Sequence, residues 1–454
     1  MSPYQVVVRL WMMLFGDSEA SVRMPSVIFS VATLPLLYAL ARRLAGMRVA
    51  VAATILFAVN LYSIRYAQEA RCYSLMTLLA VCSWVFFLRC LDAPSIPNYA
   101  TYVMTTVLGA YTHIFDTLSY PAQWIPLAWR SRRIKLRFGL IASIVLICAL
   151  VFPKGLSVLL TDVGQGSWTP PLRPAAISAL FCEFSGSMTT GRGEFLLTAV
   201  YLIAVVCGAL ALIFDDRESD RSGDRRWFIL LGFAFPIVVV LVTSLVKPLL
   251  VNRYLSEALP FFVILCASGL FRMWPRWIGA AGLVAIAVLS LYQDYLYYRY
   301  YKGDDWRAAT TYILADAKPG DAVIFVFAGS RWPYDYYVSK SGLAEFPPVI
   351  FPAWDRHFSV EGIDWAHYAS ETIIFEPIVM RAIDNAPKRY DRIWLAQWPI
   401  DFFRDADGDP YRRKAAAMNN RLLAAIGARY RLNSEKDFDQ IHVLLYDRAS
   451  HAPH

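Results

Sequence analysis

Long apolar segments are the feature that most restricts how this chain can fold. A helix that crosses a membrane needs about 20 mostly apolar residues, and the sequence supplies about ten candidate segments. They are residues 25–41, 49–64, 73–91, 98–115, 117–129, 138–157, 194–214, 227–246, 255–271 and 276–296. We therefore predict a polytopic α-helical membrane protein of about ten spans.

The composition supports this fold class. Hydrophobic residues make up 57% of the 454 residues and charged residues 18%, whereas soluble domains are less apolar and more highly charged. These values exclude a disordered chain, a collagen and a coiled coil. The net charge of +8 does not indicate nucleic acid as a partner, because the basic residues gather in short loops between the apolar segments.

Those basic loops predict the orientation in the membrane. Clusters of arginine follow the first, fifth, seventh and ninth segments, at residues 42–48, 130–137, 217–226 and 272–276. Basic loops mark the cytoplasmic side, so the N-terminus is expected outside the cytoplasm. Met1–Pro25 has no signal-peptide pattern, and such an N-terminus is difficult to insert. We therefore expect one more span before Met1.

Beyond the last apolar segment the sequence changes character. Residues 297–454 contain no run long enough to cross a membrane and are rich in charge, and the orientation places them outside the cytoplasm. We predict two domains, a transmembrane domain over 1–296 and an extracytoplasmic α/β domain over 297–454. The second should contain helices over 304–317 and 412–430, and strands over 322–327, 392–397 and 441–446.

Several common site motifs are absent. The sequence has no P-loop, no G-x-G-x-x-G after a strand and no H-E-x-x-H, so nucleotide-binding and metalloprotease functions have no support. The seven cysteines form no C-x-x-C pair and lie mostly within apolar runs. We predict no cofactor, and a requirement for a divalent metal ion stays open.

The candidate site residues are polar groups at the outer ends of the spans. Glu69 and Arg71 lie where the chain re-enters the membrane after a short outer loop. Ionisable groups at this depth are costly and often functional. An interfacial ion pair or a helix cap is an equally simple explanation of these two residues.

Two further outer loops carry candidates. His113 stands in Tyr-Thr-His, three residues before Asp116, and can be a packing residue or a ligand. Arg253 and Tyr254 begin the ninth span, where an arginine can bind a phosphate or ordinary lipid headgroups. The loop 161–192, which holds Asp162 and Glu183, either covers a cavity or simply connects two spans.

Five motifs together resemble one family. Ser2–Ser26, Tyr66-Ala-Gln-Glu-Ala-Arg-Cys-Tyr-Ser-Leu75, Tyr111-Thr-His113, Arg253-Tyr-Leu-Ser-Glu-Ala-Leu-Pro260, and Asp305-Trp-Arg307 with Lys318-Pro-Gly-Asp321 occur in the expected order. They are similar to motifs of the GT-C glycosyltransferases, in the branch of the protein mannosyltransferase-like and aminoarabinose-transferase-like enzymes. The resemblance covers nearly the whole chain.

The resemblance implies an integral-membrane, mannosyltransferase-like enzyme, and the predicted topology with its short loops fits a bacterial inner membrane. It would transfer a sugar from a polyprenyl-phosphate carrier to a glycan, lipid or protein acceptor on the non-cytoplasmic side. Arg253, and secondarily Arg71, would stabilise the departing phosphate, while Glu69, His113 and Tyr254 would line the cavity. The family's catalytic Asp lies before the Ser2-Pro3-Tyr4 stretch, so here it is expected upstream of Met1, and neither Asp116 nor Asp162 takes its role.

Two other functions stay open at the level of the sequence. One is a non-catalytic, N-terminally truncated GT-C relative that binds polyprenyl-phosphate lipids or supports a polysaccharide assembly complex. The other is a transporter, which would be expected to show repeated halves, and we find none.

Overall fold

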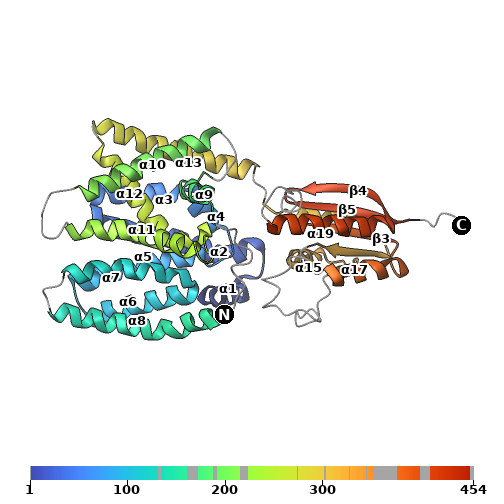
Figure 1. Cartoon of the computed structure of the whole chain (residues 1–454), viewed down its shortest axis with the longest axis horizontal. Helices are drawn as coiled ribbons and strands as arrows, with labels where there is room; N and C mark the ends of the chain where they lie inside the picture. Colours follow the sequence, from blue (N-terminus) through green and yellow to red (C-terminus); the bar gives the residue numbers. More distant parts are fainter. Residues whose placement is uncertain are drawn as a thin grey trace. The chain divides into compact units, whose positions relative to one another are not determined.

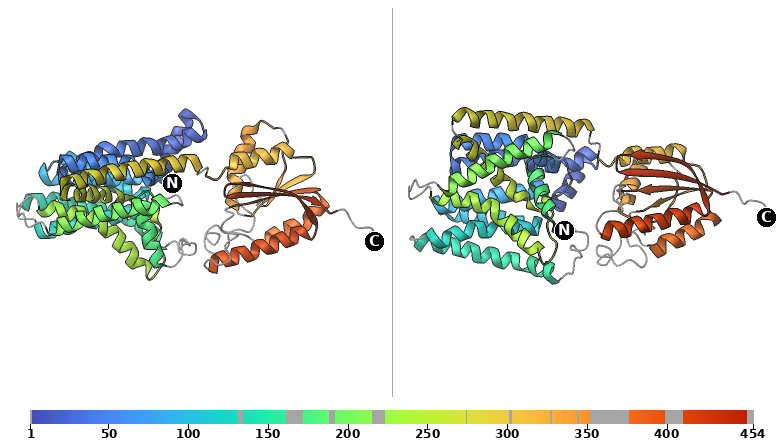
Figure 2. Two further views of the ribbon diagram at one scale, coloured as in Figure 1. Left: turned by 90° about the horizontal axis from the view of Figure 1, so that it is seen from above. Right: turned by 45° about the horizontal axis from the view of Figure 1, so that its top comes forward.

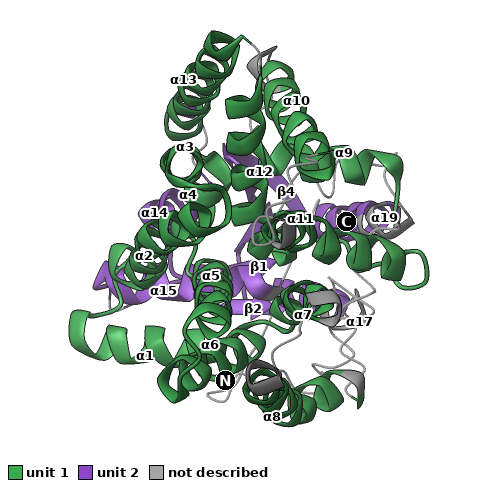
Figure 3. Ribbon diagram, turned by 90° about the vertical axis from the view of Figure 1, so that its left-hand side faces the viewer, with its two compact units in different colours: residues 1–162, 171–299 green, residues 163–170, 300–454 purple. Residues whose placement is uncertain are grey.

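The structure is a computed structural model that describes residues 2–130, 134–160, 172–187, 192–214, 223–273, 275–300, 303–326, 328–343, 345–351, 376–398 and 410–449. The chain divides into two compact units, shown in separate colours in Figure 3. Unit 1 comprises Met1–Asp162 and Pro171–Arg299, and unit 2 comprises Val163–Pro170 and Tyr300–His454.

Unit 1 is built from helices that lie side by side (Figure 1). In chain order they are α1 (Pro3–Phe15), α2 (Glu19–Ala45), α3 (Met47–Ala58), α4 (Leu61–Ala67), α5 (Tyr73–Asp92), α6 (Ile96–Thr112), η1 (Ile114–Leu118), α7 (Ser119–Arg130), α8 (Ile134–Leu160), α9 (Pro174–Phe184), α10 (Arg192–Ile213), α11 (Gly223–Ser244), η2 (Asn252–Ala258), α12 (Leu259–Arg272) and α13 (Arg276–Tyr300). All ten expected apolar segments are therefore helical.

Fewer of these helices qualify as spans than the sequence predicted. Among the described residues, seven helices are long and apolar enough to cross a membrane, and eight if the bent pair α3–α4 counts as one span. The segments expected at 98–115 and 117–129 correspond to α6, of 17 residues, and to η1 with α7, of 12 residues. α6 ends at Thr112, and His113, which has an extended backbone, separates it from η1, so both segments are shorter than expected. The predicted class, a polytopic helical membrane protein, is confirmed.

Glycine lets two helices of unit 1 approach closely. A Cβ built on Gly269 of α12 would lie 1.9 Å from the Ala204 carbonyl oxygen, and one on Gly208 of α10 would lie 2.2 Å from the Leu265 carbonyl oxygen. Backbone therefore packs against backbone, a mode of association common in membrane helices, where burial of apolar surface gives little driving force. This contact fixes α12, which follows the turn that carries Arg253.

Unit 2 is an α/β fold around a five-stranded sheet of order β2-β1-β3-β5-β4. Its elements are α14 (Trp306–Asp316), β1 (Asp321–Phe325), η3 (Ala328–Ser330), α15 (Arg331–Ser341), β2 (Val349–Phe351), α17 (Glu376–Asn385), η4 (Ala386–Lys388), β3 (Arg392–Gln397), α19 (Pro410–Gly427), β4 (Tyr430–Phe438) and β5 (Ile441–Arg448). β1 pairs in parallel with β2 and β3, while β5 pairs antiparallel with β3 and β4.

Helices cover both faces of this sheet (Figure 2), and the side chains of its central strands β1 and β3 are buried. Side chains alternate along a strand, so Val323 and Phe325 pack with α14 and α15, while Ile324 packs with α17 and α19 on the other face. This explains why β1 and β3 read as continuous apolar runs.

One expectation for unit 2 was wrong. The sequence extended a helix to Tyr430, but α19 ends at Gly427 and Tyr430 starts strand β4. β4 lies at the edge of the sheet, and most of its side chains are exposed, so it lacks the apolar pattern that marks a strand. A tight turn at Asp439, which has a φ of 56°, joins it to β5.

Candidate functional site

The site is built where the span α3–α4 breaks. The two helices meet at an angle of 57°, and Asn60 caps the second one by accepting a hydrogen bond from the Ser63 amide at 3.3 Å. The buried Asn60 side chain also donates to the Phe184 carbonyl at 2.9 Å. One residue thus fixes the start of α4 against the end of α9.

The loop after α4 carries two of the predicted residues. Glu69 forms ion pairs with Arg65 at 3.6 Å and with Arg71 at 3.8 Å. The Arg71 side chain is 58% exposed and that of Glu69 is 29% exposed. These distances are longer than those of a hydrogen-bonded ion pair, so the group is open to solvent and loosely held.

Three tyrosines connect this loop to the next helix. The rings of Tyr62 and Tyr66 have centroids 4.6 Å apart, and those of Tyr66 and Tyr73 are 5.3 Å apart. Behind them is a cavity of ≈ 20 Å³ lined by these tyrosines and by hydroxyl side chains such as Ser256. A polar cavity of this size has room for one water molecule.

Arg253 and Tyr254 lie on the turn η2, and hydrogen bonds hold this turn in place. Tyr62 Oη donates to the Asn252 carbonyl at 3.0 Å, and Ser256 Oγ donates to the Arg253 carbonyl at 2.6 Å. Arg253 Nε donates to Tyr73 Oη at 2.9 Å. The guanidinium is therefore oriented by a side chain of another helix.

His113 reaches the same place from the end of α6. Its ring centroid lies 4.8 Å from that of Tyr254 and 5.9 Å from that of Tyr73. His113 Nδ1 is buried, and no residue that the structure describes donates or accepts a hydrogen bond there.

An apolar groove opens beside the Glu69 loop. It has a volume of ≈ 510 Å³ and is lined by one face of α1, including Val8, Met12 and Met13, together with Arg9. Ala70, which lies between Glu69 and Arg71, is also one of its lining residues. The groove therefore reaches a residue that lies between two charged ones.

The structure brings together the five residues named from the sequence. Tyr73 joins His113, Arg253 and Tyr254 through ring contacts and one hydrogen bond. The Tyr66–Tyr73 contact links them to the loop of Glu69 and Arg71. Their roles stay predictions.

Sequence reasoning missed two residues of this cluster. Tyr73 stood inside the Glu69 motif, but nothing in the spacing showed that it would meet Arg253. Glu183 stood in the loop 161–192, and it accepts a hydrogen bond from Asn252 Nδ2 at 2.8 Å. Part of that loop forms helix α9, while Asp162 lies outside the described residues. Asp116 is fully buried, in η1.

No metal site is apparent among the residues that the structure describes, since no group of three or more His, Cys, Asp or Glu is placed to hold an ion. The absence of a cofactor stays a prediction.

Known proteins resemble this chain in sequence over its first part and in fold over its whole length. Residues 4–156 match the family model described as dolichyl-phosphate-mannose-protein mannosyltransferase. No curated protein matches the chain by sequence.

Two crystal structures of ArnT from Cupriavidus metallidurans share the fold. The apo structure is 10% identical, with a TM-score of 0.56, over 97% of this chain and 86% of ArnT. The structure bound to undecaprenyl phosphate is 11% identical, with a TM-score of 0.57, over 100% of this chain and 88% of ArnT. The family model matched by residues 4–156 and the fold shared with ArnT over nearly the whole chain both agree with the resemblance to the GT-C glycosyltransferases found in the motifs.

Proposed function

We propose that this protein transfers a sugar from a polyprenyl-phosphate carrier to a glycan, lipid or protein acceptor. The reaction would take place on the non-cytoplasmic side of a bacterial inner membrane, where unit 2 would also lie. The observation that carries the proposal is that Arg253 and Arg71 both lie near Tyr73, while an apolar groove reaches Ala70 beside Arg71. Arg253 is oriented by Tyr73, and Arg71 stands next to a groove-lining residue.

This arrangement suits a lipid phosphate. The apolar groove matches a polyprenyl chain, and guanidinium groups match the phosphate at its end. The ArnT of similar fold binds undecaprenyl phosphate, a ligand of the same class. When the bond between sugar and phosphate breaks, negative charge grows on the phosphate, and a fixed Arg253 would stabilise that charge. A mannosyl donor agrees with the description of the matched family model.

The test uses the purified full-length protein in lipid nanodiscs. Undecaprenyl phosphate binding is measured first, and then transfer from undecaprenyl-phosphate-linked sugars to envelope extracts. We expect Arg253→Ala to lower the transfer rate about 10²–10³-fold, as the loss of a group that stabilises transition-state charge does. Arg276→Ala, an exposed residue at the start of α13, serves as the control for the loss of a surface charge.

Three outcomes separate the alternatives. Binding and transfer that both depend on Arg253 support the proposal. Binding without transfer favours the non-catalytic GT-C relative. If undecaprenyl phosphate does not bind the wild-type protein, the proposal is wrong.

A further inference from the structure

Glu183 is a carboxylate at the site to which the motifs give no role. It lies in the last turn of α9, and the residues that follow it are firmly anchored. The Phe184 carbonyl accepts from Asn60, and Ser185 Oγ is hydrogen-bonded to Thr198 Oγ1 at 2.9 Å. Gly186 has a φ of +79°, and a Cβ there would lie 3.0 Å from the Leu61 amide nitrogen. Glu183 is therefore held in a fixed position against the start of α4.

One of its two carboxylate oxygens is engaged. Asn252 Nδ2 donates to Glu183 Oε1 at 2.8 Å, and Asn252 directly precedes Arg253. Among the described residues, no other hydrogen bond reaches this carboxylate, and the side chain is only partly buried. Oε2 is thus able to accept a hydrogen bond from a ligand.

The electrostatic setting of Glu183 combines burial with nearby positive charge. Burial raises the pKa of its carboxyl group, while the Asn252 hydrogen bond and the charges of Arg65 and Arg253 lower it. Glu69 is different, because it already forms ion pairs with two arginines. Among the described residues of the cluster, Glu183 has a fixed position and a carboxylate oxygen, Oε2, that can accept a hydrogen bond from a ligand.

The neighbours of Glu183 indicate which part of a substrate would meet it. In a polyprenyl-phosphate sugar, the sugar is bonded directly to the phosphate, and its nearest hydroxyl is only a few bonds away. A phosphate bound at Arg253 would therefore bring sugar hydroxyls toward Glu183. We propose that Glu183 Oε2 accepts a hydrogen bond from a hydroxyl group of the sugar being transferred, so that Glu183 helps to select the sugar. This inference rests on the proposed function and adds a specificity-determining residue to it.

The test compares two lipids on the same protein. Bare undecaprenyl phosphate reports on the phosphate site, and undecaprenyl phosphate carrying mannose, glucose or arabinose reports also on the sugar site. Glu183→Gln keeps an oxygen for Asn252 but removes the negative charge, whereas Glu183→Ala removes both. We expect each variant to bind the bare lipid within about threefold of wild type, and to lose about tenfold or more in affinity for the sugar lipid that wild type prefers.

A second measurement keeps the proposal falsifiable if these variants fold poorly. Wild-type protein is tested with a series of deoxy analogues of the preferred sugar lipid, each lacking one hydroxyl. Wild-type protein should bind one of the deoxy analogues about as weakly as Glu183→Gln binds the complete sugar lipid. Glu183→Gln should bind that same analogue no more weakly than wild type does, because the hydrogen bond is already lost. A wild-type protein that binds every analogue equally overturns the proposal.

The other outcomes also decide. If the Glu183 variants lose equal affinity for the bare and the sugar-bearing lipid, Glu183 only positions the η2 turn. If they keep their affinity for both lipids, Glu183 contacts no sugar. Either result overturns the inference. A wild-type protein that prefers no sugar lipid over the bare lipid overturns it as well. In each of these cases the bare lipid still binds, so the proposed function survives. If wild-type protein does not bind undecaprenyl phosphate, both the proposed function and the inference on Glu183 are wrong.

Discussion

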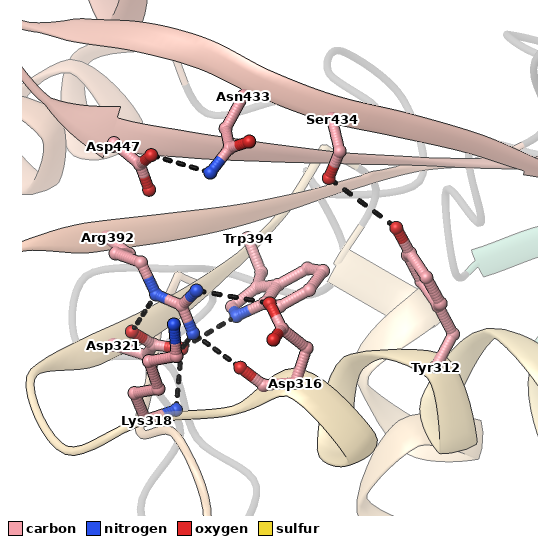
Figure 4. Close-up of polar contacts among 9 residues, drawn as sticks. All are labelled: Tyr312, Asp316, Lys318, Asp321, Arg392, Trp394, Asn433, Ser434 and Asp447. Atoms are coloured by element: carbon pink, nitrogen blue, oxygen red, sulfur yellow. Dashed lines mark hydrogen bonds and ion pairs between the residues drawn. The ribbon is translucent and has the colours of Figure 1, made fainter.

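Two clusters of charged side chains, one in each unit, differ in how completely their groups are paired. In unit 2, Arg392 donates to both carboxylate oxygens of Asp321, at 2.8 and 2.7 Å, and Trp394 Nε1 donates to Asp321 at 2.9 Å (Figure 4). The Lys318 amide adds a bond to the same carboxylate at 3.0 Å, and Asp316 pairs with Arg392 at 3.1 Å.

The cluster in unit 1 has looser pairs. Glu69 is 3.6 and 3.8 Å from its arginines, Glu183 has one engaged oxygen, and His113 Nδ1 has no partner among the described residues. Asp321 is 1% exposed and Glu69 is 29% exposed. A network that satisfies every group stabilises the fold, whereas a network with unused donors and acceptors can bind something else.

The largest effect is therefore expected in unit 2. The Arg392 side chain is only 12% exposed. Asp321→Ala would remove the carboxylate that accepts two hydrogen bonds from its guanidinium group. Removing one member of a buried ion pair costs about 3–5 kcal/mol. Hydrogen exchange of the full-length protein should show faster exchange in β1 and β3, because local stability governs protection.

This experiment has a control in the same protein. Asp335→Ala removes an exposed partner of Arg331, and it should change exchange by no more than a surface ion pair does, about 0–1 kcal/mol. Equal protection of β1 in the Asp321 and Asp335 variants would contradict the distinction between closed and open clusters.

Asp116 is the intermediate case, a buried carboxyl group beside the open cluster. Tyr120 Oη lies 2.8 Å from Asp116 Oδ2 and also hydrogen-bonds the Thr106 carbonyl, which can only accept. Tyr120 has one hydroxyl hydrogen for these two acceptors, and burial raises the pKa of the Asp116 carboxyl group, so we expect Asp116 to be protonated and to supply a second hydrogen. A Cβ on Gly109 would lie 1.9 Å from Asp116 Oδ2, so only glycine leaves room for this group.

A protonated Asp116 leads to a specific prediction. Asp116→Asn should change the unfolding free energy little, because the amide can donate to Tyr120 as the acid does, while Asp116→Ala should cost about 1–3 kcal/mol for the lost bond. Thermal unfolding in detergent measures both. If Asn proves as destabilising as Ala, the carboxyl group is ionised and the assignment is wrong.

The sequence predicted the elements of this protein better than its contacts. Apolar length identified the ten helical segments expected in unit 1 but not α1 or α9, and continuous apolar runs identified β1 and β3. Strand β4 was not predicted, because an exposed edge strand has no apolar pattern. Glu69, His113 and Arg253 were recognised from motifs, but the meeting of Tyr73 with Arg253 joins residues 180 positions apart. Such a pairing depends on how helices pack, which local patterns do not encode.

Tyr73→Phe tests how much the orientation of Arg253 matters. The change removes the acceptor that Arg253 Nε uses at 2.9 Å and leaves the ring contacts with Tyr66 and His113 in place. Because the cluster is open, water can replace part of this bond, and we expect a loss of about 1 kcal/mol, roughly fivefold in undecaprenyl phosphate affinity. Tyr292→Phe, an exposed tyrosine of α13, is a matched control that should leave the affinity unchanged. An unchanged affinity in Tyr73→Phe would mean that Arg253 needs no support from α5.

The smallest effect on stability is expected at Glu69, and it completes the comparison with Asp321. Glu69→Gln weakens two ion pairs that are long and partly exposed, so it should cost less than about 1 kcal/mol in unfolding free energy. The same change should still reduce sugar transfer, because Glu69 is paired with Arg71 of the candidate site. A variant as destabilised as Asp321→Ala would show that the cluster in unit 1 is structural. If Glu69→Gln is stable but transfers sugar more slowly than wild type, the loosely paired charges of this cluster contribute more to transfer than to folding. Comparing the loss of transfer rate with the loss of unfolding free energy then measures how far the two roles differ.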